Sequence, residues 1–460
     1  MYDTIAAVAT AAGEAGIGVI RISGPDSLAI LEKVFQYKSG KKLKDPEPRK
    51  MIYGYISDGR RIIDEAMVVY MKAPHTYTGE DVVEIQCHGS PVTLRQILSL
   101  VFERGAGPAE RGEFTKRAFL NGRIDLSQAE AVIDVVRARS QAGSEAAVSQ
   151  LSGRLSSEVS KIRHEMADLV SEIAVRIEYP DEDLEEMKNS DIIEEIDRIY
   201  GEIKAMADTA STGRVFRDGC RIALAGRPNT GKSSLMNALL REERAIVTDI
   251  PGTTRDTIEE YADLGGIPVK IVDTAGIRES GDEIEKIGIG RSRDAIDASD
   301  IVILMLDSSG TLRDEDREVI PMVEGRRLIV ALNKSDLPQV LDPAGILHET
   351  GLPEDTPVVE ISAVNGEGIQ DLIEEIKKIV FGGGISMEQD IMVADARHEE
   401  LMKESMKSLS DAKNMLSRGE ALDFTESDIR SAWMTLGEIT GESVNDDIVN
   451  EIFSRFCLGK

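Results

Sequence analysis

The chain has 460 residues, a length that corresponds to about three domains and allows large hydrophobic cores without disulfide staples. Its 54 Lys and Arg residues against 83 Asp and Glu residues leave a formal charge of −29. This balance excludes a general nucleic-acid coat protein, which carries a basic face, although it does not exclude a local basic site. With 41% hydrophobic and 30% charged residues, the composition is that of a folded protein rather than a disordered one.

Cysteine usage and hydropathy indicate where the protein works. Cys87, Cys220 and Cys457 are too few and too scattered for a disulfide framework or a thiolate zinc site, and the five histidines have no metal-ligand spacing. Free thiols favour a reducing, cytoplasmic location. The N-terminus lacks the basic region of a signal peptide, and no apolar run reaches the roughly 18 residues that a membrane span needs. We therefore expect a soluble cytoplasmic protein without a membrane partner.

The pattern of the chain changes near residue 118. Residues 1–118 mix short β-branched runs with glycine turns, which predicts a small α+β domain. Residues 119–217 are helical in pattern, and one apolar seam with alternating spacings of four and three predicts a long helix. The seam consists of Leu155, Val159, Ile162, Met166, Leu169 and Ile173. In the preceding α+β domain, the expected strands lie at 18–22, 66–70 and 82–85.

The second half of the chain alternates strands with helices and then becomes helical again. Near-continuous apolar runs within 218–380 are typical of a parallel sheet covered on both faces. Neither 119–217 nor 381–460 is large enough to bury its own apolar face, so we expect one all-α helical domain with an inserted α/β domain. The expected strands lie at 221–225, 269–272, 301–306 and 328–332; the expected late helical faces are Met402, Met406 and Leu409, and Ile448, Ile452 and Phe456.

A phosphate-binding loop follows the first of these strands. Residues 226–234 read GRPNTGKSS, which fits the pattern G-x-x-x-x-G-K-[ST]. Its glycines let backbone N–H groups wrap a phosphate, Lys232 neutralises the β- and γ-phosphate oxygens, and the Ser233 hydroxyl can bind Mg²⁺. The alternative, a glycine turn that binds nothing, is disfavoured by the strand before the loop and the helical segment after it. The expected nucleotide contacts here are Asn229, Thr230, Gly231, Lys232, Ser233 and Ser234.

Three downstream elements arrive in the order that a GTPase requires. Residues 273–276 (DTAG) end a buried strand and place a carboxylate near Mg²⁺ and a backbone N–H near the γ-phosphate. Asp336 in 333–336 (NKSD) can accept hydrogen bonds from N1–H and N2–H₂ of guanine, and adenine would leave this carboxylate unsatisfied. The third element, Ser362-Ala363, follows the apolar run at 358–361 and fits a backbone contact to the base. The sequence therefore predicts GTP binding, with further contacts from Asp273, Thr274, Ala275, Gly276, Asn333, Lys334, Asp336, Ser362 and Ala363.

Between these motifs lies a candidate switch, residues 251–256 (PGTTRD). A threonine there can complete Mg²⁺ coordination and sense the γ-phosphate; the alternative is an ordinary polar loop. Ile277 stands where many Ras-like enzymes have a water-orienting glutamine, so another group must position the attacking water. The nearby candidates are Arg255, Arg278, Asp282, Glu283 and Glu285.

Several segments outside the GTPase motifs are distinctive. They read AVAT at 7–10, GIGVIRISG at 16–24, YTGEDVVE at 77–84, GEFTKRAFLNGRIDL at 112–126 and FCLGK at 456–460. Together they resemble the tRNA-modifying GTPase family MnmE, also called TrmE, over essentially the whole chain. A departure is AER at 109–111, where the family usually has Ala-Arg-Pro.

The resemblance implies a multidomain α/β fold. Its parts are an N-terminal α+β domain (1–118) that binds tetrahydrofolate and dimerises, a helical domain (119–217 and 381–460), and an inserted Ras-like P-loop G domain (218–380). The family works with the flavoprotein MnmG, in an expected heterotetramer, to add aminomethyl or carboxymethylaminomethyl groups to carbon 5 of the wobble uridine in certain tRNAs. The one-carbon unit comes from a 5,10-methylene- or 5-formyl-tetrahydrofolate, whereas FAD and NADH belong to the partner. GTP hydrolysis drives G-domain dimerisation and a conformational change.

At the nucleotide site, the resemblance implies K⁺ and a catalytic acid. The K⁺ ion takes the place of an arginine finger and stabilises charge between the β- and γ-phosphates. Glu285 matches the family's catalytic glutamate, with Arg255 and Arg278 as secondary candidates. The implied K⁺ ligands are Asn229, Thr248, Ile250 and Thr253, the implied Mg²⁺ ligands are Ser233 and Thr254, and Asp249, Pro251 and Gly252 are further GTP contacts.

The resemblance also implies a folate site formed by Arg21, Glu84, Arg123 and Lys460. Cations suit the glutamyl carboxylates of folate, and an acid suits the pterin amino group; without the resemblance, Arg21 and Glu84 are strand-edge charges. For Cys457 the residues alone favour a buried cysteine at a helix end. The resemblance favours a functional role in the terminal Cys-x-Gly-Lys, either catalytic or in shaping the folate pocket.

Two other functions fit the GTPase motifs. A switch-type GTPase in ribosome assembly or signalling would use GTP only to control binding, and it predicts an RNA-binding appendage such as a basic KH-like unit, which we do not find in the sequence. A scaffold with GTPase activity but no one-carbon chemistry would bind no tetrahydrofolate. The terminal cysteine and the folate-like segments favour the hypothesis that the protein is a tRNA-modifying GTPase.

Overall fold

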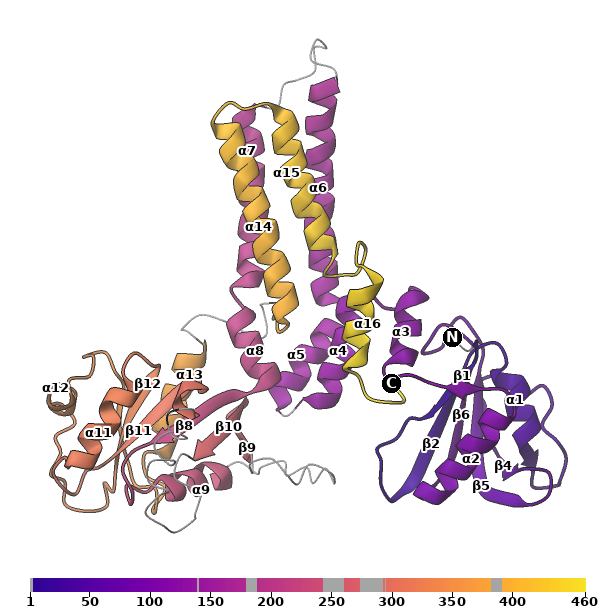
Figure 1. The fold of residues 1–460 in the computed structure, drawn as a ribbon, viewed down its shortest axis with the longest axis horizontal. Helices are drawn as coiled ribbons and strands as arrows, with labels where there is room; N and C mark the ends of the chain where they lie inside the picture. Colours follow the sequence, from indigo (N-terminus) through magenta and orange to yellow (C-terminus); the bar gives the residue numbers. More distant parts are fainter. Residues whose placement is uncertain are drawn as a thin grey trace. The chain divides into compact units, whose positions relative to one another are not determined.

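The computed structural model of the chain describes residues 3–138, 140–178, 188–242, 260–273, 293, 295–381 and 391–460 (Figure 1). The chain divides into two compact units. The first comprises Met1–Val136, Gln150–Pro180 and Glu426–Lys460, and the second comprises Arg137–Ser149 and Asp181–Thr425.

The N-terminal part of the first unit is a seven-stranded sheet in the order β3-β4-β5-β6-β2-β1-β7. Neighbouring strands are antiparallel, except that β1 and β7 run parallel. Helices α1 (Ser27–Val34) and α2 (Pro91–Glu103) pack their apolar residues on one face (Figure 1). The strands are β1 (Ile5–Val8), β2 (Ala15–Ser23), β3 (Phe35–Tyr37), β4 (Ile52–Ser57), β5 (Ile62–Met71), β6 (Val82–Gly89) and β7 (Gly107–Pro108).

Side-chain alternation in this sheet separates the core from the candidate folate residues. Ile20 and Ile22 of β2 are fully buried, as is Ile85 of β6. Arg21 and Glu84 are paired in register across these two strands and lie on the opposite face, because successive side chains of a strand alternate. The strands expected at 18–22, 66–70 and 82–85 are therefore confirmed within β2, β5 and β6.

The remainder of the first unit is helical. The predicted long helix is confirmed as α6 (Arg154–Glu178), and all six residues of its seam are buried. Buried Arg163 of α6 joins it to the C-terminal helices: its guanidinium lies 4.4 Å from the ring of Trp433 and pairs with Glu442. The other helices are α3 (Glu113–Leu120), α4 (Leu126–Arg137), most of α15 (Leu422–Gly437) and α16 (Asp446–Ser454).

The last helix buries a face that differs in part from the predicted one. Val449 and Phe453 are the buried residues of α16, whereas Ile448 is 37% exposed. Phe456 is buried but lies beyond the helix, where its ring packs 5.2 Å from that of Phe453. Ile452 and Phe456 pack on one apolar cluster with Val449 and Phe453, so the predicted face is confirmed for these two residues and wrong for Ile448. Helical spacing also placed Phe456 on the helix, whereas it lies beyond the helix end.

The second unit contains a six-stranded sheet in the order β13-β12-β11-β8-β10-β9, and only β9 is antiparallel to its neighbour. Helices α9 and α13 cover one face, and α11 and α12 cover the other, which confirms the predicted sheet buried on both sides. The bounds are β8 (Cys220–Ala225), α9 (Lys232–Glu242), β9 (Glu260–Leu264), β10 (Ile267–Asp273), β11 (Ile301–Asp307), α11 (Asp314–Val323), β12 (Leu328–Asn333), α12 (Ile346–Thr350), β13 (Val358–Ile361) and α13 (Ile369–Phe381).

Two helices from either side of this sheet in the sequence pack together. Helix α7 (Asn189–Ala207) precedes the sheet and α14 (Ala396–Ser417) follows it, and Figure 1 shows them side by side. Met402 and Leu409 of α14 are fully buried, and Met406 is half-buried. The α/β segment is thus inserted between two partner helices; the unit also holds α8 (Ala210–Asp218) and most of α5 (Gln141–Leu151).

Among the helices that the structure describes, none combines the length and the hydropathy that crossing a bilayer requires.

Candidate functional site

The phosphate-binding loop joins β8 to α9, so its backbone N–H groups gather at a helix N-terminus, where anions bind favourably. Asn229 and Gly231 have positive φ angles of 64° and 99°. A Cβ on Gly231 would lie 2.2 Å from Nδ2 of Asn333, so the close approach of the two loops requires glycine there. The Lys232 ammonium donates to the carbonyl oxygens of Gly226 at 2.5 Å and Arg227 at 2.8 Å, inside the curve of the loop.

Asn333 ties three loops together at the end of β12. Its Nδ2 donates to the carbonyl oxygen of Thr230 at 2.7 Å, and its Oδ1 accepts from the backbone N–H of Ala363 at 3.0 Å. The Ser362 hydroxyl donates to Asp336 Oδ1 at 2.7 Å and orients that carboxylate. The phosphate loop, the Asn-Lys-x-Asp loop and the Ser-Ala loop are therefore held as one assembly.

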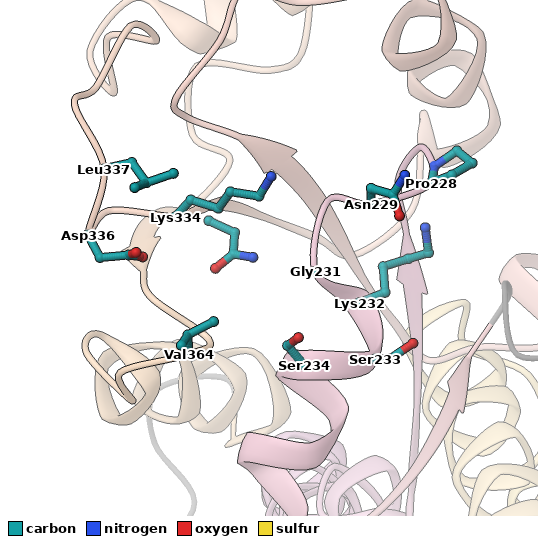
Figure 2. A pocket seen from close by; sticks show the side chains of 11 residues that line it. Pro228, Asn229, Gly231, Lys232, Ser233, Ser234, Lys334, Asp336, Leu337 and Val364 are labelled. Atoms are coloured by element: carbon teal, nitrogen blue, oxygen red, sulfur yellow. The ribbon is translucent and has the colours of Figure 1, made fainter.

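These loops enclose a cavity of about 590 Å³, a volume typical of small-molecule sites. Figure 2 shows Lys232, Ser233 and Ser234 on one side of the cavity and Asp336 with Val364 on the other. Cationic and N–H groups thus face a carboxylate across the site, which suits a ligand with phosphates at one end and a donor-rich base at the other. The lining residues are Pro228, Asn229, Gly231, Lys232, Ser233, Ser234, Asn333, Lys334, Asp336, Leu337 and Val364.

Most of the described nucleotide contacts predicted from the sequence line this cavity. Thr230, Ser362 and Ala363 instead contribute through the hydrogen bonds of the loop assembly. Asp273 ends β10, whose neighbour β8 runs parallel to it toward the phosphate loop. The remaining predicted residues lie outside the described part of the chain: Thr248, Asp249, Ile250, Pro251, Gly252, Thr253, Thr254, Arg255, Thr274, Ala275, Gly276, Arg278 and Glu285.

Three residues that line the cavity were not predicted from the sequence: Pro228, Leu337 and Val364. Leu337 and Val364 directly follow the two base-side motifs and are 45% and 80% exposed. Apolar side chains left exposed beside a cavity can pack against the faces of a base. Their positions directly after Asp336 and Ala363 could have identified them in the sequence as cavity residues.

The candidate folate residues Arg21 and Glu84 contact each other directly. Arg21 donates from Nε at 2.9 Å and from Nη2 at 2.8 Å to one Glu84 carboxylate oxygen. The Arg21 guanidinium also lies over the rings of Tyr77, at 5.1 Å, and Phe114, at 5.7 Å. Arg123 lies over the same Tyr77 ring at 5.0 Å and donates to its backbone carbonyl oxygen. The two aromatic rings were not predicted from the sequence, because neither carries a charge or a metal-binding group.

The C-terminal tail lies against this same face. Arg111 and Leu458 form a β-bridge, and the N–H of Gly112 donates to the carbonyl oxygen of Cys457 at 3.4 Å. Burial, together with the nearby charge of Arg21, lowers the pKa of the Lys460 ammonium. The structure therefore brings all four candidate folate residues to one place.

Cys457 is exposed, so the expectation of a buried helix-end cysteine is wrong. The reason is that the tail leaves α16 before this residue and runs along the N-terminal domain.

The three thiols should differ sharply in reactivity. Burial raises the pKa of Cys87 to about 11 and that of Cys220 to about 12, and both side chains are shielded from reagents. We expect Ellman's reagent to titrate about one thiol per native chain at neutral pH, Cys457, and all three after denaturation. A Cys457→Ser variant should show no rapid native reaction. Rapid reaction of two or more native thiols would contradict this.

A mainly parallel sheet that carries a phosphate loop, an Asn-Lys-x-Asp loop and a Ser-Ala loop around one cavity defines a P-loop GTPase. Residues 4–123 match the family described as the GTP-binding protein TrmE N-terminus, and residues 126–457 match the MnmE helical domain. The chain belongs to the tRNA modification GTPase MnmE family.

Full-length relatives support this assignment. The tRNA modification GTPase MnmE of Alkaliphilus metalliredigens is 46% identical over 460 residues, which is 100% of this chain and 99% of the relative. That of Clostridioides difficile is 44% identical over 458 residues, with the same coverage of both chains. Among solved structures, the FeoB G-domain from Methanococcus jannaschii is 27% identical over 35% of this chain and 97% of its own, with a TM-score of 0.27, which is too low to carry an inference.

Proposed function

We propose that this GTPase is a component of a tRNA-modifying enzyme. With a flavoprotein partner of the MnmG kind, it adds an aminomethyl or carboxymethylaminomethyl group to C5 of the wobble uridine of certain tRNAs. The observation that carries the proposal is the C-terminal Cys-x-Gly-Lys tail placed beside Arg21, since a GTPase that only switches binding has no need of such a site. Full-length relatives named for tRNA modification support the same reaction.

At the nucleotide end, the phosphate loop and Lys232 bind the phosphates, and Asp336 accepts hydrogen bonds from guanine. Oxygen donors of the kind that Mg²⁺ and K⁺ prefer are present, since Ser233 and Asn229 both line the cavity. Bound there, the two cations would supply positive charge against the β- and γ-phosphate oxygens. We assign Mg²⁺ to Ser233 and Thr254, and K⁺ to Asn229, Thr248, Ile250 and Thr253. Glu285 orients the attacking water, with Arg255 and Arg278 in secondary roles.

At the folate end, the donor set fits a tetrahydrofolate derivative, which would supply the one-carbon unit. Arg21 and Lys460 offer cations to its glutamyl carboxylates, and Glu84 can accept from its pterin amino group. Arg123 holds the backbone of Tyr77, whose ring adds an aromatic surface to the site. Cys457 is exposed on the same tail as Lys460, and we assign it a catalytic role.

We propose that these tasks belong to separate segments. We assign folate binding and homodimerisation to residues 1–118, a helical scaffold to 119–217 and 381–460, and GTP hydrolysis to 218–380. Hydrolysis drives dimerisation of the G domains and the movement that modification needs. FAD and NADH stay with the partner in a heterotetramer, and the site of action is the cytoplasm.

The decisive measurement is nucleoside mass spectrometry of tRNA from a strain that lacks the gene. We expect the C5-modified wobble uridines to disappear, to return with the wild-type gene, and to stay absent with Glu285→Ala, a variant expected to bind GTP without hydrolysing it. Asp314→Asn, which changes an exposed carboxylate on α11, is the control that should restore them. Unchanged wobble uridines in the deletion strain would instead favour a ribosome-assembly or signalling switch.

A further inference from the structure

The second residue of the phosphate loop is a buried arginine that does not line the nucleotide cavity. Arg227 is 8% exposed, and its guanidinium is held by two carboxylates. Nη2 donates to Asp307 Oδ2 at 3.2 Å, and Nε donates to Asp316 Oδ2 at 3.1 Å. The side chain therefore acts on the back of the loop and anchors it to the sheet and to α11.

Asp307 contacts the base-side loop as well. It ends β11, and the Oδ2 atom that accepts from Arg227 also accepts from Lys334 Nζ at 2.7 Å. Its other oxygen accepts from the hydroxyl of Ser309 at 2.6 Å and from the Ser309 N–H at 3.2 Å. Burial opposes the charge of this carboxylate, but the hydrogen bonds from Lys334 and Ser309 outweigh burial and lower its pKa to about 2. Asp307 is therefore ionised throughout the neutral range.

Lys334 is held in an unusual conformation at the other end of this bridge. Its φ is 71°, in the left-handed region. Figure 2 shows its side chain extending from the base side of the cavity toward the phosphate loop, and its stem forms part of the cavity wall. One carboxylate oxygen thus links the loop that binds phosphates to the loop that selects the base.

Asp316 completes the network from α11. It is 3% exposed, its Oδ2 also accepts from the N–H of Arg313 at 3.0 Å, and its Oδ1 is buried without a hydrogen-bond partner among the described residues. Arg227 thus pairs with Asp307 and Asp316, and half-buried Lys334 pairs with Asp307, in a group with balanced charge. Removing one charge from such a group leaves another uncompensated, which makes the network sensitive to single substitutions.

We propose that Asp307 is a positioning residue that sets the spacing between the phosphate loop and the Asn-Lys-x-Asp loop, and thereby the residence time of the guanine nucleotide. A nucleotide contacts both the phosphate loop and the Asn-Lys-x-Asp loop only while the two loops keep their separation. Small displacements of binding groups lower the affinity for the nucleotide. Weakening the contacts of Asp307 with Arg227 and Lys334 therefore weakens binding of both the phosphates and the base, and it speeds nucleotide release. The inference rests on the GTP-binding role of this cavity and is independent of the tRNA chemistry.

The test is the dissociation rate of N-methylanthraniloyl-GDP from the full-length chain, measured by stopped flow. Asp307→Asn keeps the shape of the side chain but removes its charge. We expect dissociation to accelerate at least about 30-fold, which corresponds to the lower end of the cost of losing one partner of a buried charge pair. KM for GTP should rise by a similar factor while kcat changes less than about 3-fold. Asp314→Asn, an exposed carboxylate on the same helix α11, is the matched control and should release nucleotide at the wild-type rate.

A second variant separates positioning from a general loss of structure. Arg227→Gln should also accelerate release. The effects of Asp307→Asn and Arg227→Gln should be less than additive in the double variant, because the two residues share the Arg227–Asp307 contact. If Asp307→Asn does not accumulate as folded protein, Arg227→Lys carries the test, and its release should be faster than wild type.

Three results would overturn the inference: wild-type release rates in the variants, a fall in kcat with unchanged release, or additive effects in the double variant. Failure of the wild-type chain to bind the GDP probe would instead contradict the nucleotide site itself.

Discussion

Replacing Asp336 by asparagine should lower the affinity for GTP by at least about 100-fold and shift the preference to xanthosine triphosphate. The Asp336 carboxylate is oriented by Ser362 and faces the cavity, where it can accept from both N1–H and the exocyclic amine of guanine. An asparagine amide would set its own N–H₂ against that amine. Xanthine carries a carbonyl oxygen at the same position, so the amide can donate to it while still accepting from N1–H.

The measurement is competition of GTP and xanthosine triphosphate against a fluorescent nucleotide. Asp314→Asn serves as the matched control, since it makes the same chemical change on an exposed part of α11 and should leave both affinities unchanged. If Asp336→Asn lost affinity equally for GTP and xanthosine triphosphate, the loop would be disrupted. Unchanged affinity for GTP would mean that guanine does not contact Asp336.

Replacing Gly459 by alanine should reduce the affinity for 5-formyl-tetrahydrofolate by at least about 10-fold, because a lost charge-assisted contact is worth that much. Gly459 has a φ of 89°, and a Cβ there would lie 2.2 Å from the carbonyl oxygen of Val8. Since the obstacle is backbone of a sheet strand, the tail must move instead. Lys460 would then leave Arg21, although every charged group of the site remains in the protein.

Gly419→Ala is the matched control for this experiment. Gly419 has a φ of 73° but no atom within 4 Å of the added Cβ, so the substitution adds backbone strain without a clash. Calorimetric titration should show near wild-type folate affinity for Gly419→Ala and weak binding for Gly459→Ala. Equal affinities in the two variants would separate the tail from the folate site, and no binding by the wild-type chain would contradict the folate proposal itself.

Local patterns in the sequence predicted the elements that depend on local physics. The seam of α6 follows from helical periodicity, and the strands of the second sheet follow from apolar runs that only a sheet covered on both faces can bury. The phosphate loop is visible in the sequence because its backbone requires glycine at Gly226 and Gly231, both of which have positive φ.

Contacts between distant segments were not predictable in the same way. Helical spacing predicted Ile448 and Phe456 on one face of a helix, whereas Ile448 is exposed and Phe456 lies beyond the end of α16, where its ring packs on Phe453. Tyr77 and Phe114 carry no motif, yet both lie under the Arg21 guanidinium. Asp307 follows an apolar run and resembles an ordinary strand-end charge, because its partners Arg227 and Lys334 are 80 and 27 residues away in the chain.

By itself, the sequence determined the class of the protein and the order of its nucleotide motifs, because these depend on residue type and short spacing; the candidate folate residues came only from the resemblance to a family. Only the tertiary structure decided how they act together. It placed the C-terminal tail against the N-terminal sheet, exposed Cys457, and joined the two nucleotide-binding loops through one carboxylate. The physical reason is that hydrogen bonds and ion pairs act over only a few ångströms. Only folding brings residues that are distant in the sequence this close together.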